Sequence, residues 1–249
     1  MVTLKSNSEI EKMKAAGEIA ISALYEAREH IKPGVSTFFL DEVINKYIVR
    51  YGAKPSFLGY GGFPASACIS LNDMIIHGIP SKDVILKEGD IVSIDVGAYY
   101  KGFHGDCART YGVGEISDNA KMLIDVTRES FFVGIKKAVV GNRMGDLSSA
   151  IGNYAEKFGY GVVEDYTGHG IGRNLHEDPS VPNYGTEGRG IRFQKGMTIA
   201  VEPMINEGTK DFYVLDDKWS VITLDHKLSA HYENTIAITD DQPIILTKV

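Results

Sequence analysis

An internal repeat with a spacing of 107 residues constrains the fold of this chain more than any other feature. The segment 34–52 recurs as 141–159, with glycine at both ends and apolar or aromatic residues at matching positions between them. Ten residues that end at Asp95 align at the same spacing with ten that end at Glu202. Chance similarity could explain a match between two helical segments alone, but it explains the matched carboxylates poorly. The chain therefore predicts two copies of one structural unit.

Each copy is predicted to contain a pair of helices followed by a hairpin. Apolar residues recur at three- and four-residue spacing over 10–31, which is typical of an amphipathic helix. We expect this helix to begin with a capping box formed by Ser8 and Glu11 and to end before Pro33. A second helix with one apolar face then runs as far as Gly52.

The duplicated plan predicts an α+β fold with pseudo-two-fold symmetry. We expect a central, curved, antiparallel sheet with helices on its outer face and the acidic residues on its inner face. The halves are about 1–115 and 116–249, and no proline-rich or low-complexity linker separates them. Residues 1–249 are therefore expected to form a single catalytic domain.

Two aspartates in the first hairpin indicate a metal site. Asp95 ends the apolar run 91–94, and Asp106 follows 11 positions later, beyond the turn-like segment 99–102. A hairpin centred between residues 100 and 101 makes the two aspartates direct cross-strand partners. Like charges at such positions destabilise a sheet unless a proton or a cation lies between them.

The second copy supplies a matching pair of glutamates. Glu233 comes 20 positions later than the repeat predicts, so we expect a longer hairpin tip that includes Trp219. The combined set suits two divalent ions that share bridging carboxylates, because five ligands are too many for one catalytic ion. Solvated surface carboxylates are commoner in general, but several of these acids lie in or beside strand-like runs, where unpaired charge is costly. The predicted ligands are Asp95, Asp106, His169, Glu202 and Glu233.

Other histidines lie among small or apolar residues, a setting that is more often structural than catalytic. The triplet His-Gly-Ile occurs once in each half, at 77–79 and 169–171, which favours a role in a site. The glycine-rich run 168–172 lacks both the dinucleotide-binding pattern and a P-loop lysine, so nucleotide binding is excluded. A structural role is favoured for the two histidines that adjoin the acidic residues, His104 and His231.

Composition excludes several other classes of protein. The chain has 26 basic and 33 acidic residues, a net charge of -7 and no Lys/Arg run, so nucleic acids and membranes are not expected as direct partners. No apolar stretch approaches the ~18 residues of a membrane span, and the opening residues do not form a signal peptide. A cytoplasmic location is therefore expected. The two cysteines, Cys68 and Cys107, form no Cys-x-x-Cys pair, which excludes a thiolate zinc site.

Five motifs together resemble the methionine aminopeptidases, specifically the short type I form within the creatinase or pita-bread fold. The resemblance covers nearly the whole chain. The motifs are Ile94-Asp95-Val96, Gly102-Phe103-His104-Gly105-Asp106, Gly168-His169-Gly170-Ile171-Gly172, Val201-Glu202-Pro203 and Tyr232-Glu233-Asn234-Thr235.

The resemblance implies a reaction and a set of roles. The reaction is co-translational removal of the initiator methionine from nascent proteins with a small second residue, by attack of a metal-activated hydroxide on the first peptide bond. Asp95 would bind one ion, His169 and Glu202 the other, and Asp106 and Glu233 would bridge both, with Co, Mn, Fe or Zn as candidate metals. Catalytic roles are implied for three residues: Glu202 as proton shuttle, and His77 and His176 as groups that contact the peptide and stabilise the tetrahedral intermediate.

The resemblance also implies a methionine pocket lined by Tyr60, Phe63, Cys68, Leu175 and Trp219, beside His77 and His176. Leu175 stands where a phenylalanine is common, so the pocket is expected to be wider on that side. Cys107 is expected to point away from the metals. A monovalent cation, Na or K, would be held largely through backbone oxygens by Asn72, Met74 and Ser229.

We expect a monomer that acts on nascent polypeptide N-termini, transiently near the ribosome. The length of 249 residues leaves no room for the helical insertion of type II relatives or the extra N-terminal domain of prolidases. The alternatives are an aminopeptidase or dipeptidase of the same fold with Xaa-Pro specificity, and a non-catalytic peptide-binding module.

Overall fold

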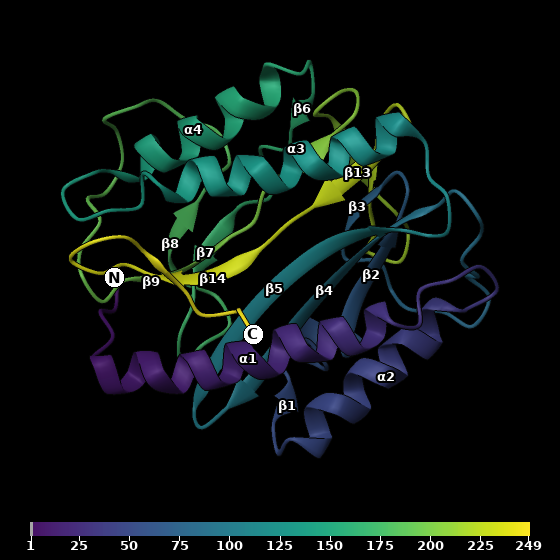
Figure 1. Cartoon of the computed structure of the whole chain (residues 1–249), viewed down its shortest axis with the longest axis horizontal. Coiled ribbons are helices and arrows are strands. Elements are labelled where there is room, and N and C mark those ends of the chain that lie inside the picture. The colour runs from purple at the N-terminus through teal and green to yellow at the C-terminus, as the bar shows by residue number, and fades with distance from the viewer. Residues whose placement is uncertain (1) are drawn as a thin grey trace.

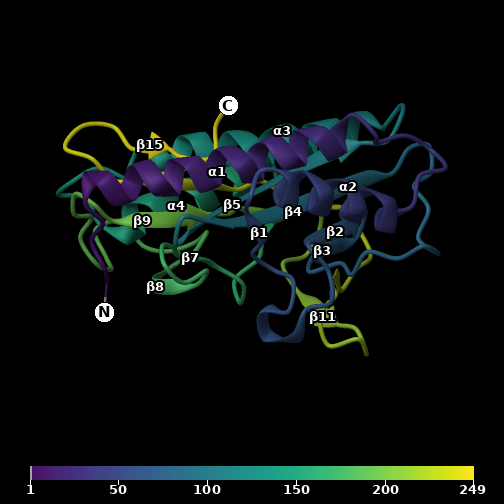
Figure 2. The same cartoon turned by 90° about the horizontal axis from the view of Figure 1, so that it is seen from below.

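The computed structural model describes residues 2–249, and its helices lie together on one side of a layer of strands (Figures 1 and 2). The helices are α1 (Asn7–Arg28), α2 (Thr37–Arg50), α3 (Asp118–Ile135) and α4 (Met144–Glu156), with a short 3-10 helix η1 (Tyr60–Gly62). The pair α1 and α2 covers one half of the layer, and the pair α3 and α4 covers the other (Figure 1). None of the helices in the described part of the chain combines the length and apolar character needed to cross a bilayer.

The strands form four hydrogen-bonded sheets, and every pairing between named strands is antiparallel. The strands of the first half are β1 (Lys54–Pro55), β2 (Ala67–Leu71), β3 (Met74–Ile76), β4 (Ile91–Tyr100) and β5 (Phe103–Gly112). The strands of the second half are β6 (Gly161–Val162), β7 (Gly168–Gly170), β8 (Glu177–Val181), β9 (Thr198–Val201), β10 (Met204–Asn206), β11 (Phe212–Val214), β12 (Val221–Thr223), β13 (Ser229–His231), β14 (Asn234–Ala237) and β15 (Ile244–Ile245).

The duplication is visible residue by residue. Helices α2 and α4 begin 107 residues apart, and so do strands β4 and β9. An isolated β-bridge joins Ser36 to Ile85 in the first copy, and its counterpart at the same spacing joins Arg143 to Arg192. The α+β fold with two related helix-plus-hairpin halves and helices on the outer face is therefore confirmed.

The two halves meet where β5 lies beside the start of β14. Ala108 N donates to Glu233 O at 3.4 Å, and Glu233 N donates back to Ala108 O at 2.9 Å. This reciprocal backbone pair links the two largest sheets, although β5 and β14 are not otherwise paired as strands. Asp106 and Glu233, one carboxylate from each half, are consequently brought to the same seam.

The predicted register of the first hairpin is wrong by two residues. Lys101 and Gly102 form the whole turn, both with positive φ (49° and 86°), so Tyr100 pairs with Phe103. Such two-residue turns match the twist of the flanking strands. Asp95 therefore lies opposite Ala108 rather than opposite Asp106. Because the shift is an even number, both aspartates remain on one face of the sheet.

The capping box of α1 also differs from the prediction. The helix begins at Asn7, so Ser6 rather than Ser8 is the N-cap residue. Glu9 rather than Glu11 closes the box, because its Oε2 accepts a hydrogen bond from Ser6 N at 2.9 Å. The error is a shift of two residues within a run that contains both serines.

The longer tip of the second hairpin contains two additional strands, β11 and β12. Strand β12 pairs with β3 of the first half, at Val221–Ile76 and Ile222–Met74. The turn between β11 and β12 carries Trp219. The insertion therefore pairs with the first half of the chain and contains Trp219.

Helix α1 approaches β5 closely because a glycine lies at the contact on each element. A Cβ added to Gly105 would lie 2.5 Å from Gly17 N and 2.6 Å from Gly17 Cα. These neighbours are backbone atoms of a helix, so they cannot move independently. We expect Gly105→Ala to lower the free energy of unfolding by about 1–3 kcal/mol, as overpacking does elsewhere, measured by urea denaturation.

The matched control is Glu18→Ala, which changes an exposed residue of α1 beside Gly17. Its stability should remain near that of the wild type. Equal stability of Gly105→Ala and the wild type would show that the contact between α1 and β5 can relax.

Candidate metal centre and substrate pocket

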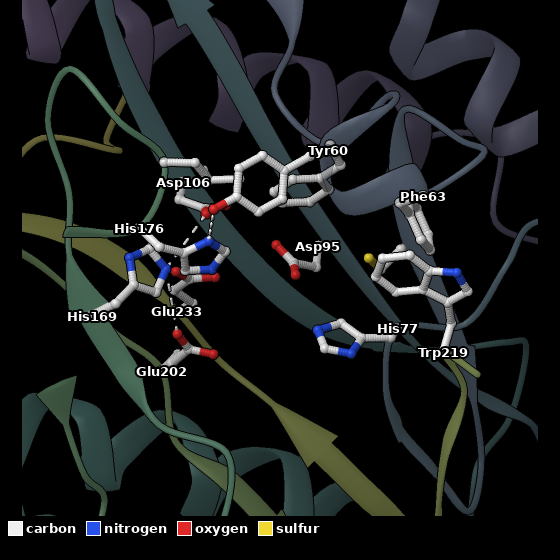
Figure 3. Close-up of a pocket in the computed structure, with 13 residues that line it drawn as sticks. Tyr60, Phe63, His77, Asp95, Asp106, His169, His176, Glu202, Trp219 and Glu233 are labelled. Atoms are coloured by element: carbon white, nitrogen blue, oxygen red, sulfur yellow. Dashed lines mark hydrogen bonds and ion pairs between the residues drawn. The ribbon is translucent and has the colours of Figure 1, made fainter. Parts of the chain in front are cut away.

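The five predicted ligands come from five different segments and converge on the face of the strands away from the helices (Figure 3). Asp95 lies in β4, Asp106 in β5 and His169 in β7. Strand β9 ends at Val201, and Glu202 and Pro203 follow it directly. Glu233 lies between β13 and β14. Each carboxylate is therefore placed by strand backbone rather than by a long loop.

Asp106, His169 and Glu233 each offer a ligand atom within 4.8 Å of the other two. His169 Nε2 lies 3.9 Å from Asp106 Oδ2 and 3.7 Å from Glu202 Oε1. The other ring nitrogen, Nδ1, donates to Gly170 O at 2.8 Å, which directs the lone pair of Nε2 toward the carboxylates. Burial lowers the pKa of His169 to about 3, so its imidazole is neutral at neutral pH.

Burial also shifts the pKa values of the carboxylates, and it raises them rather than lowering them. It raises the pKa of Asp106 to about 7. The pKa values of Asp95, Glu202 and Glu233 are raised well above their usual range, by burial first and then by the negative charge of Asp106. A set of buried acids that repel one another has a strong electrostatic demand for a cation.

Unpaired carboxylate oxygens make the cluster suitable for divalent ions. Three buried carboxylate oxygens have no hydrogen-bond partner among the described residues: Asp95 Oδ1, Asp106 Oδ1 and Glu233 Oε1. Buried polar atoms are nearly always paired, so unpaired carboxylate oxygens that line one cavity are available to bind a cation. Oxygen atoms with one imidazole nitrogen are a donor set that suits hard to borderline divalent metals.

Three residues that the sequence analysis did not single out hold these ligands in place. Thr235 Oγ1 accepts from Asp106 N at 2.9 Å and donates to Asp106 O at 3.0 Å. Arg109 Nη1 donates to Glu233 O at 2.5 Å, and Asn183 Nδ2 donates to Glu202 O at 3.0 Å. Thr235 belongs to the motif Tyr232-Glu233-Asn234-Thr235, but its partner Asp106 is 129 residues away. No local sequence pattern could reveal the contact.

A single cavity contains all twelve predicted catalytic, metal-binding and substrate-binding residues. Its volume of about 180 Å³ is far more than the ~10–15 Å³ needed for one water, so it is large enough for a ligand. Phe57 completes the lining and was missed, although it lies only three residues before Tyr60. The predicted residues in the cavity are Tyr60, Phe63, Cys68, His77, Asp95, Asp106, His169, Leu175, His176, Glu202, Trp219 and Glu233.

One side of the cavity is apolar. The rings of Phe63 and Trp219 meet edge to face with their centroids 5.1 Å apart. Leu175 is buried beside them, and Cys68 pairs in register with Asp95 across β2 and β4. Burial, together with the nearby Asp95 carboxylate, raises the pKa of the Cys68 thiol well above its usual range. The thiol therefore contributes a neutral, polarisable surface rather than a thiolate.

His77 and His176 approach the acidic cluster from different sides (Figure 3). His176 Nδ1 is hydrogen-bonded to the Tyr60 hydroxyl at 2.8 Å, and its ring centroid lies 4.2 Å from that of His169. His77 has a positive φ of 61° and meets the ring of Tyr166 edge to face. Burial lowers the pKa of His77 to about 4 and also lowers that of His176, so both imidazoles are neutral at neutral pH.

The other predicted residues lie outside this cavity. Ser229 N donates to Asn72 O at 2.8 Å, so these two members of the predicted monovalent-cation site are neighbours, while Met74 lies nearby in β3. The Cys107 thiol contacts Val96 O at 3.7 Å. His104 is tied to Ser56, and His231 places Nε2 3.7 Å from Glu202 Oε2.

Comparison with known proteins identifies the class to which this fold and site belong. A model of metallopeptidase family M24 matches residues 11–240. The chain is 53% identical to a methionine aminopeptidase of Clostridium acetobutylicum over 99% of both chains, and 47% identical to methionine aminopeptidase 1 of Bacillus subtilis over the full length of both. The crystal structure of a methionine aminopeptidase from Thermotoga maritima matches the whole chain with a TM-score of 0.98 and 46% identity.

The chain therefore belongs to metallopeptidase family M24 and, within it, to the methionine aminopeptidases. It is an enzyme of a hydrolase family whose acidic cluster is suited to divalent metal. A prolidase from Pyrococcus furiosus shares the fold at a TM-score of 0.81 and 26% identity, but this chain spans only 65% of it.

The raised pKa of Asp106 predicts how the stability of the metal-free protein depends on pH. Between about pH 4 and about pH 7, the unfolded chain has released a proton that folded Asp106 still holds, so the contribution of this group to stability falls as pH rises. We expect metal-free Asp106→Asn to become more stable than the metal-free wild type as pH rises through this window. Thermal melts at several pH values measure the difference.

Asp83→Asn, which neutralises an exposed carboxylate, is the control and should show no such trend. A constant difference in melting temperature between Asp106→Asn and the wild type at all pH values would contradict the assignment.

Proposed function

We propose that this protein removes the N-terminal methionine from newly made polypeptides whose second residue is small. The observation that carries the proposal is the single cavity in which an apolar slot opens directly onto a buried acidic cluster. A slot lined by aromatic rings, a thiol and a leucine suits a thioether side chain, because such surfaces are polarisable and uncharged. The reacting bond then lies one residue's length from the bound side chain, over the carboxylates.

The proposed ligands of two divalent ions are Asp95, Asp106, His169, Glu202 and Glu233. Bound ions of this kind supply Lewis-acid activation of water and of the scissile carbonyl. Mn, Fe, Co and Zn all accept this donor set, so availability rather than the protein selects among them. The duplication supports the roles that the family resemblance implies. Asp95 and Glu202 are equivalent residues of the two halves and would each serve one ion, Glu202 together with His169, whereas Asp106 and Glu233 lie at the seam and would serve both.

The chain's own residues supply orientation and proton transfer. Glu202 is proposed as the proton shuttle, because the family resemblance implies this role and burial raises the pKa of its carboxyl group. His77 and His176 are neutral, so each can donate a hydrogen bond to the substrate carbonyl or to the oxyanion without adding a competing charge. The Tyr60 hydroxyl fixes the ring of His176 for this role.

The proposal extends to the domain organisation, a monovalent cation and the cellular setting. We propose that residues 1–249 act as one catalytic domain, because the backbone pair between Ala108 and Glu233 joins the halves at the site itself. A monovalent cation, Na or K, is proposed near Asn72, Met74 and Ser229. The expected setting is the cytoplasm, where a monomer would meet nascent polypeptides close to the ribosome.

The first test compares substrates and metals. With added Mn or Co, the protein should release methionine from Met-Ala-Ser, and a chelator should abolish the activity. Peptides that begin Xaa-Pro should be hydrolysed far more slowly. Preferential hydrolysis of Xaa-Pro would assign a prolidase-like specificity, and chelator-resistant activity, or none with any metal, would remove the metallopeptidase assignment.

The second test separates proton transfer from substrate contact. Glu202→Gln should lower kcat by at least about 10²–10⁴-fold, because it removes the proposed proton shuttle and also alters a proposed metal ligand. His176→Ala should lower kcat by about 10²–10³-fold, the usual effect of losing one stabilising donor, while metal content measured by mass spectrometry stays unchanged. Loss of metal from His176→Ala would show that His176 is a ligand instead.

A further inference from the structure

His176 lies in a segment that has no regular secondary structure of its own. Residues 172–176 form a series of bends before β8 begins at Glu177, and they carry both Leu175 and His176 into the cavity. The position of the imidazole therefore depends on the contacts of this segment as well as on strand β8, which begins at the next residue. We call residues 172–177 the His176 loop.

A buried ion pair ties the His176 loop to the N-terminal segment of the chain. Lys5 Nζ lies 2.5 Å from Glu177 Oε2, and the two side chains are only 3% and 11% exposed. The ammonium also donates to Thr3 O at 3.1 Å. The second oxygen of Glu177 accepts from Asn174 N at 3.0 Å, so one carboxylate holds both the N-terminal segment and the backbone of the loop.

The packing around Lys5 leaves little freedom. A Cβ added to Gly172 would lie 2.4 Å from Lys5 Cε and 2.8 Å from Glu177 Oε1, so only glycine leaves room for the lysine there. The backbone of Lys5 is fixed as well, because its N donates to Gly196 O at 2.7 Å. The side chain of Lys5 thus packs against Gly172, and its backbone is held by Gly196.

A second ion pair links the His176 loop to the start of helix α1, and this pair is exposed. Arg173 Nη2 lies 3.0 Å from Glu9 Oε1, with 66% of the arginine side chain accessible. Exposed pairs contribute little because solvent screens them. Breaking a buried pair is far more costly, because the remaining charge is left without a partner. The two pairs therefore form a matched comparison on one loop.

We propose that Lys5 and Glu177 are positioning residues for His176, a role that rests on the proposed function. Neither side chain lines the cavity, so their influence on the reaction passes through the placement of the imidazole. A displacement of about 1 Å in a catalytic group can cost about 10²-fold in rate. The N-terminal segment is consequently part of the catalytic apparatus, although it lies outside the pocket.

The test is a double-mutant cycle on kcat between Lys5→Met and His176→Ala. In the wild-type background we expect Lys5→Met to lower kcat by about 10–10²-fold, the range set by such displacements. In the His176→Ala background the same change should cost less than about threefold, because coupled residues are not additive. Arg173→Met is the matched control and should stay within about twofold of the wild type.

Amide exchange supplies a readout that does not depend on activity. Lys5→Met should accelerate exchange in residues 172–177 about tenfold or more over the wild type, whereas Arg173→Met should not. If Lys5→Met does not fold, Glu177→Gln takes its place, since its amide oxygen can still accept from Asn174 N.

Two results would overturn the inference: an equal loss of kcat in both backgrounds, or unchanged exchange in the His176 loop. An inactive wild type would remove the proposed function, and the exchange data would then still decide whether the ion pair fixes the loop.

Discussion

The rest of the structure depends on the burial of four mutually repelling carboxylates around one imidazole. Holding them together costs free energy in the absence of a cation, and the surrounding framework is arranged to oppose their separation. Strand backbone places Asp95 and Asp106, while Thr235 and Arg109 fix the main chain at Asp106 and Glu233. The cluster lies where β5 meets the start of β14. The two halves of the fold are therefore joined where the buried acidic side chains are gathered.

Duplication explains how such a cluster can arise, and departures from it explain how the cluster becomes a specific site. The two copies deliver carboxylates at equivalent positions, which yields a nearly symmetric set of oxygens. His169 has no counterpart among the proposed ligands of the first half, so the two proposed metal positions would differ in donor chemistry. The His176 loop and the β11–β12 insertion, both in the second half, add His176 and Trp219 to the lining of the cavity.

The sequence predicted the architecture well and the local geometry less well, and the twelve residues that it proposed for the site line one cavity. The 107-residue repeat set the spacing of helices and strands because periodic burial is a local property of the chain. The register of the first hairpin was missed because Lys101 takes a positive φ, which propensity alone disfavours for a lysine. Asn183 and the Lys5–Glu177 pair were missed for another reason, since their partners are distant in sequence and only the folded chain brings them together.

The β11–β12 insertion has a consequence for how this enzyme can change. Trp219 stands on a segment that has no equivalent in the first half and contributes none of the proposed metal ligands. The part of the proposed methionine pocket that Trp219 forms therefore lies on a segment separate from the residues proposed to bind metal. A substitution at Trp219 would change the shape of that pocket without replacing a proposed ligand.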